Sequence, residues 1–195
     1  MDDRPFHHGN LRVALLDRAE VVLRERGLAA LSLREMAREA GVSHGAPRNH
    51  FPDRTALLDA LAERGLRRLA ADVVAATAAV NGVGPSLRAA GAAYLRFAHE
   101  NPALVELIMA TKTGTASPSA QAAAHDLREI MTALVARGVD EHVCTVEQVP
   151  RLTLLLSATA QGIANMVATG GLDLAQAGEL LDEAIRRFAS PVTGA

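Results

Sequence analysis

The sequence predicts an all-α protein of about nine helices, and three observations support that fold class. Apolar residues recur at helical spacing through most of the chain, whereas no strand-like alternation and no internal repeat is present. Glycines, prolines and capping residues separate these stretches at short intervals. The chain has 195 residues, of which 49% are apolar, so it can bury a substantial core.

The stretch SLREMAREAGVSHGAPRNHF, residues 32–51, predicts a helix, a tight turn and a second helix. Ser32 and Glu35 have the spacing of a capping box, in which each side chain accepts a backbone N–H at a helix start. Gly41 follows as the stop, because a residue without a side chain adopts the left-handed turn at little cost. A short helix is expected over 43–49. This arrangement is a helix-turn-helix, whose second helix can enter the DNA major groove.

A plain helical hairpin inside an all-α core is the alternative, and it would need an apolar second helix. The second helix instead carries His44, Arg48, Asn49 and His50. These side chains form hydrogen bonds of the kind that suit base edges and phosphates, so DNA binding is the favoured interpretation.

The N-terminal part of the chain is more basic than the rest, as DNA binding by that part requires. The net charge is -2, but residues 1–68 hold 12 arginines against 10 carboxylates, and the remainder of the chain is acidic. A nucleic-acid-binding protein concentrates positive charge locally, so we expect the N-terminal unit to face DNA.

The single cysteine, Cys144, excludes an intrachain disulfide framework, and no spacing of Cys and His typical of zinc is present. His142, Cys144 and Glu147 come nearest to a metal cluster, but they are interpreted as loop and capping residues. We expect no metal, no cofactor and no enzymatic activity, because no nucleophile with a base, no carboxylate pair and no cofactor loop has a usable spacing. The N-terminus lacks the order of a signal peptide, which favours a cytoplasmic protein.

Caps and breaks mark the first four helices. Asn10 is a plausible cap for the first helix, which Gly27 ends. Pro52 breaks the third helix, and Asp53 caps a long fourth helix that reaches about Val80. The fourth helix leaves the DNA-binding unit and enters the rest of the protein, so it is a possible lever between the two parts.

The later helices are recognised by the same signals. Asn101-Pro102 opens one of them, and Thr145 and Gln148 form a capping box at the head of another. The uncharged run 152–172 contains several polar residues and glycines, which favours a buried helix rather than a membrane span. These helices are expected over about residues 87–98, 102–108, 127–138, 145–167 and 173–189.

The last two helices together offer more apolar surface than one small chain easily covers. We therefore expect a homodimer with two-fold symmetry, closed by a four-helix bundle from the last two long helices of each chain. The alternative is that both helices belong only to the core of one chain.

At this point the chain resembles a TetR-type bacterial transcriptional regulator. The resemblance is dense from Phe6 to Leu69 and rests on LLDRAEVVLRERG, LSLREMAREAGVS and HF followed by PDRTALLDAL. The lead-in FHHGNLR and the proline in SHGAPRNHF resemble one branch of that family. The sequence departs from the family at Arg48, where an aromatic residue is common, and at Asn49, where Arg is common. It also lacks Trp and has Gln161-Gly162 where the branch tends to carry His-Gly.

The resemblance implies a helix-turn-helix domain over residues 1–52 and a ligand-binding and dimerisation domain over residues 53–195. It implies a repressor that binds a palindromic operator as a dimer and is released by a small molecule. Asn49 suits adenine, and Arg48 suits either guanine or a phosphate, with both roles open. The implied DNA contacts are Ser32, Arg34, Ser43, His44, Gly45, Ala46, Arg48, Asn49, His50 and Arg54.

A small apolar or amphipathic effector is expected within helices four to eight, where its binding would change the spacing of the two recognition helices. The rival interpretation is a helical ligand carrier or adaptor without DNA binding. The predicted cavity residues are Tyr94, Phe97, Met109, Met131, Gln161, Asn165 and Met166.

Overall fold

The computed structural model describes residues 8–39, 41, 43, 45–112 and 116–188. This part of the chain contains helices and no strands, which confirms the predicted all-α class. The α-helices are α1 (His8–Arg26), α2 (Leu33–Glu39), α3 (Arg54–Thr77), α4 (Val83–Glu100), α5 (Pro102–Lys112), α6 (Pro118–Asp140), α7 (Val149–Ala168) and α8 (Leu174–Phe188). Short 3-10 helices are η1 (Leu28–Ala30), η2 (Ala46–Asn49) and η3 (Val146–Gln148).

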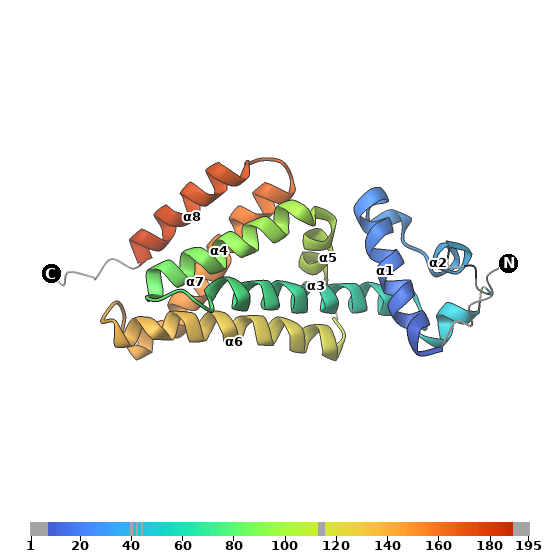
Figure 1. Cartoon of the computed structure of the whole chain (residues 1–195), viewed down its shortest axis with the longest axis horizontal. Helices are drawn as coiled ribbons and strands as arrows, with labels where there is room; N and C mark the ends of the chain where they lie inside the picture. Colours follow the sequence, from blue (N-terminus) through green and yellow to red (C-terminus); the bar gives the residue numbers. More distant parts are fainter. Residues whose placement is uncertain (1–7, 40, 42, 44, 113–115, 189–195) are drawn as a thin grey trace.

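The molecule has a small N-terminal unit and a larger helical bundle, with α3 running through both (Figure 1). The unit consists of α1, α2 and η2, and α3 leaves it to pack against α4, α5 and α6. Asp53 caps α3 as predicted, because its side chain accepts a hydrogen bond from the Ala56 N–H at 2.8 Å. The long helix predicted to begin after Asp53 is therefore α3. It runs without a break from the N-terminal unit into the larger bundle.

Apolar side chains of α1 form the core of the N-terminal unit. Leu15, Ala19 and Val22 are fully buried, and Met36 of α2 and Phe51 after η2 complete the same core. Burying a large apolar side chain contributes about 1.5 to 3 kcal/mol. These contacts, rather than the short helices themselves, therefore hold the helix-turn-helix in place.

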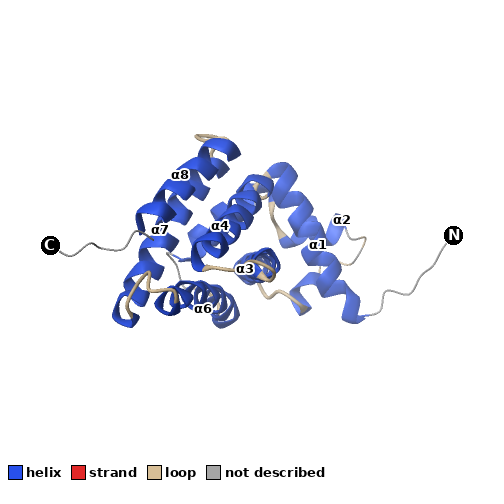
Figure 2. Ribbon diagram, turned by 60° about the vertical axis from the view of Figure 1, so that its left-hand side comes forward, coloured by secondary structure: helices blue, strands red, loops and turns tan. Residues whose placement is uncertain are grey.

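In the larger bundle α4 lies between α3 and the α7–α8 pair (Figure 2). Gly91 of α4 faces Leu181 of α8, and a Cβ atom at Gly91 would lie 2.1 Å from Leu181 Cδ2. Any larger residue at this position would force the Leu181 side chain to move, so the glycine lets α4 and α8 approach closely. No helix in the described part of the chain is long and apolar enough to cross a membrane.

The two predicted capping boxes have different outcomes. Thr145 and Gln148 form a complete box at the start of η3, directly before α7. Ser32 accepts the Glu35 N–H at 3.1 Å, but the Glu35 carboxylate pairs with Arg38 at 2.6 Å. The prediction for Glu35 was therefore wrong, because a nearby guanidinium offers this carboxylate a charge-assisted hydrogen bond, which is stronger than one from a backbone N–H.

Candidate nucleic-acid interface and ligand cavity

The turn of the helix-turn-helix has the predicted glycine stop. Gly41 has φ +65°, in the left-handed region, and its N–H donates to the Arg38 carbonyl at 3.3 Å. Side chains are strained in that conformation, so glycine is the residue that ends α2 at little cost.

The recognition segment is more tightly wound than the sequence predicted. Residues Ala46–Asn49 form the 3-10 helix η2, where an α-helix was expected over 43–49. Pro47 lies at the start of η2 and has no N–H, so it cannot donate a helical hydrogen bond. The Arg48 N–H donates to the Gly45 carbonyl at 3.1 Å, which closes a short turn instead. Pro47 is buried, so η2 is fixed on the core by its proline.

Most predicted DNA contacts lie on the outside of this unit. Arg48 and Asn49 are exposed and adjacent at the end of η2, whereas Pro47, directly before them, is buried. His44 lies outside the described residues. Among the remaining predicted contacts, Ser32, Arg34, Ser43, Gly45 and Arg54 are exposed, and Ala46 and His50 are partly buried.

Arg54 also has a structural role that the sequence did not reveal. Its Nε donates to the Leu31 carbonyl and its Nη2 to the Leu28 carbonyl, both at 2.8 Å. These bonds hold the connector between α1 and α2 against the start of α3. Phe51, buried just before α3, also has the guanidinium of Arg12 5.2 Å from its ring centroid. The start of α3 is thus joined to the connector after α1, and the residues before α3 are joined to α1 itself.

An ion-pair cluster joins α1 to α2 behind the turn. The Glu39 carboxylate pairs with Arg18 and Arg26 of α1, and its side chain is nearly buried. These two guanidinium groups lower the pKa of Glu39 from 4.5 to about 2. The cluster is therefore charged at neutral pH and holds the two helices together.

The lowered pKa of Glu39 predicts an acid-sensitive DNA-binding unit. The stabilisation is fully present above the ordinary pKa of 4.5 and is lost as the pH falls toward about 2, because the folded form resists protonation. Glu39→Gln should therefore lower stability at neutral pH and flatten the acid limb of a urea-unfolding series between about pH 7 and about pH 3. Glu25→Gln, which alters an exposed carboxylate of α1, should leave that limb unchanged. An unaltered acid limb in Glu39→Gln would contradict the prediction.

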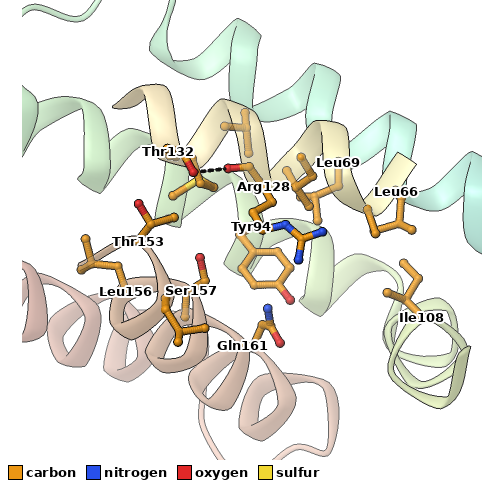
Figure 3. Close-up of a pocket in the computed structure, with 18 of the residues that line it drawn as sticks. Leu66, Leu69, Tyr94, Ile108, Arg128, Thr132, Thr153, Leu156, Ser157 and Gln161 are labelled. Atoms are coloured by element: carbon orange, nitrogen blue, oxygen red, sulfur yellow. Dashed lines mark hydrogen bonds between the residues drawn. The ribbon is translucent and has the colours of Figure 1, made fainter. Parts of the chain in front are cut away.

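A cavity of about 1150 Å³ lies among α3 to α8 (Figure 3). This volume slightly exceeds the usual range for small-molecule sites, which is about 300 to 1,000 Å³. Of the residues predicted to line it, Asn165 and Met166 do not, and both are exposed on α7. The almost uniformly apolar sequence of α7 gave no signal of which side faces inward. Five predicted residues do line the cavity: Tyr94, Phe97, Met109, Met131 and Gln161.

Polar cavity residues on α6 and α7 were missed by the sequence analysis. His125 and Arg128 lie on α6, which is amphipathic, and charged residues on such a helix are expected to face water. Thr153 and Ser157 are scattered in the apolar run of α7. These side chains of α6 and α7 line the same cavity because the helices pack together, and the sequence of either helix alone does not show this packing.

The loop containing His142, Cys144 and Glu147 holds capping interactions. Gln148 accepts the Thr145 N–H at 2.9 Å, and a hydrogen bond from the Thr145 side chain lowers the pKa of Glu147. Within the described ranges no group of three or more His, Cys, Asp or Glu residues could hold a metal ion.

Comparisons with known proteins agree with this arrangement of a DNA-facing unit and a cavity-bearing bundle. Residues 15–61 match the family model described as bacterial regulatory proteins, tetR family. Residues 87–188 match the model described as tetracyclin repressor-like, C-terminal domain. A comparison with curated protein sequences gave no match.

Solved structures resemble the whole chain. A protein with unknown function from Rhodococcus sp. RHA1 is 38% identical, with a TM-score of 0.85, over 96% of this chain and 97% of that one. The TetR family transcriptional regulator PfmR from Thermus thermophilus is 20% identical, with a TM-score of 0.67, over 92% and 99%. The ketosteroid transcriptional regulator KstR2 of Mycobacterium tuberculosis is 19% identical, with a TM-score of 0.63, over 91% and 92%. The last two likenesses concern the fold, whereas the family models identify the protein. The chain therefore belongs to the TetR family of bacterial regulatory proteins, and it is a DNA-binding transcriptional regulator.

Proposed function

We propose that this regulator is a repressor that binds a palindromic operator as a homodimer and is released by a small molecule. The observation that carries the proposal is the placement of two sites on one helix. Arg48 and Asn49 are exposed just before α3, and the same helix lines the cavity through Leu66, Leu69 and Val73. In this proposal residues 1–52 bind DNA, with the predicted contacts in the roles given above, and residues 53–195 bind the ligand and the second chain.

Exposed apolar side chains on α7 and α8 support the dimer. Leu154 is 71% exposed, and Leu155, Met166 and Leu180 are 40%, 46% and 48% exposed. Exposed leucines and methionines on two adjacent helices are typical of a surface that another chain covers. In the proposed two-fold dimer, the two copies of η2 would bind successive major grooves, which lie about 34 Å apart.

Selection of DNA from a random pool by the purified protein tests the proposed function. We expect enrichment of a palindrome with half-sites about one helical turn apart, because the two recognition segments are related by two-fold symmetry. A helical ligand carrier or adaptor would bind apolar molecules in its cavity without enriching any sequence. Absence of enrichment, together with no gel shift on the DNA flanking the coding region, would contradict the proposal.

Arg68 of α3 connects the cavity to the DNA-binding unit. Its Cζ lies 5.2 Å from the ring centroid of Phe97, which lines the cavity. Its Nη2 donates to Asn101 Oδ1 at 2.8 Å, at the end of α4, and its Nη1 lies 3.6 Å from Glu20 Oε2 of α1. One guanidinium thus contacts a cavity wall, the α4 end and the DNA-binding unit, so a ligand that moves Phe97 would change the position of α1.

Arg68→Met should reduce the coupling between the two sites while leaving each site intact. In the wild type, saturating operator DNA should weaken binding of 1-pyrenebutanol, an uncharged fluorescent probe of the cavity, by about fivefold or more, because linkage is reciprocal. In Arg68→Met that factor should approach one. Arg67→Met is the matched control, since Arg67 is exposed and pairs with Glu63 of the same helix at 2.9 Å. The same coupling factor in both variants would exclude Arg68 as the connection.

A further inference from the structure

The ionisable side chains on α6 that line the cavity are basic. His125 and Arg128 face it from α6, and no Asp or Glu is among the described residues of its wall. Both side chains are exposed and therefore lie at the opening of the cavity, whereas most of the remaining wall is apolar. A cavity of this kind favours a ligand that carries negative charge.

Arg128 is the cation best placed to bind such a ligand. Figure 3 shows its guanidinium pointing toward the Tyr94 side chain and the Gln161 amide, which come from α4 and α7. Arg64 and Arg68 pair with carboxylates of α1, whereas the Arg128 guanidinium has no acceptor among the described residues. A guanidinium presents a planar set of donors that matches a carboxylate.

Neighbouring polar groups extend this set of donors. Burial raises the pKa of Tyr94 to about 12, so its hydroxyl keeps its proton at neutral pH and can donate to an anion. The Thr153 hydroxyl is a further polar group in the wall that can bind a ligand. Thr153 is 5% exposed and lines the cavity, and its Oγ1 has no hydrogen-bond partner in the described structure. Buried hydroxyl groups without a partner are uncommon, because leaving a hydrogen bond unmade costs free energy.

We propose that the effector is an acidic amphipathic molecule whose carboxylate is bound by Arg128, with Tyr94 and Gln161 as further donors. Its apolar body would lie along Leu66, Leu69 and Ile108, which Figure 3 shows on the same cavity wall. This inference rests on the proposed ligand-responsive function and assigns its ligand class.

Two fluorescent probes that differ only in the acidic group test the inference. 1-Pyrenebutanoate carries a carboxylate on an apolar body, and 1-pyrenebutanol is its uncharged analogue. The wild type should bind the acid more tightly than the alcohol by about tenfold or more, because hydrogen bonds to a charged group are stronger than those to a neutral one. Arg128→Gln should remove that preference and leave the affinity for the alcohol unchanged.

Control variants test whether the preference for the acid arises at Arg128 and within the cavity. Arg96→Gln removes an exposed arginine of α4 outside the cavity wall and should retain the preference for the acid. Arg128→Lys keeps the positive charge and should retain part of the preference for the acid. Ala160→Phe places a ring in the cavity and should weaken binding of both probes, which locates them there.

Equal affinity of the wild type for the acid and the alcohol would overturn the inference, as would an unchanged preference in Arg128→Gln. The proposed function is judged separately by operator selection, which uses no ligand. Operator binding with no preference for the acid would overturn only the ligand class. A clear preference for the acid without operator selection would overturn only the regulatory function.

Discussion

Replacing Leu154 and Leu180 together by glutamate should convert the protein to a monomer and weaken operator binding by about a hundredfold or more. Leu154 of α7 is 71% exposed and also borders the cavity, and Leu180 of α8 is 48% exposed. Association would bury four new carboxylates without partners, which costs far more than the apolar contacts contribute. A monomer also loses the second half-site, and linked binding of two sites strengthens affinity by about 10² to 10⁴.

Sedimentation velocity and operator titration measure the two parts of this prediction. Val74→Glu is the matched control, because Val74 is 50% exposed on α3 and receives the same charge away from α7 and α8. It should leave the dimer intact. A double variant that sediments as a dimer would contradict the proposed interface, and a monomer that binds the operator as tightly as the wild type would contradict the role of symmetry.

Features set by neighbouring residues were predictable from the sequence. Asp53 and Gly41 mark a helix start and a helix end by chemistry within a few residues, and the structure has both. Pro47 shows the limit of that approach, because its effect on η2 depends on burial against the core as well as on its missing N–H. The sequence indicated a helix there but not its tighter winding.

The cavity was less predictable, because its wall combines six helices. Gln161 borders the cavity, whereas Asn165, one turn later on α7, is exposed and does not. Both are polar residues in a long apolar run, and only the packing of α7 against α4 and α6 distinguishes them. Arg128 is exposed, as expected of a charged residue on an amphipathic helix, and the sequence did not indicate that it also borders the cavity.

Arg48→Ala should weaken operator binding by about 1 to 3 kcal/mol, with the loss confined to one base position of the selected site. The side chain is exposed on η2 beside Asn49, and a guanidinium can pair with the two acceptors of guanine. Asn49→Ala should relax specificity at a neighbouring adenine for the same geometric reason. Selection from a random pool with each variant shows which position becomes tolerant.

A salt titration separates base recognition by Arg48 from a phosphate contact. Loss of a phosphate contact weakens binding to all sequences alike and lowers the dependence of log K on log salt by about one. Arg96→Ala, on the larger helical bundle, controls for the loss of one positive charge. If Arg48→Ala lowers the salt slope and leaves the selected sequence unchanged, Arg48 contacts phosphate. Specificity would then rest on Asn49 and the other exposed residues of the recognition segment.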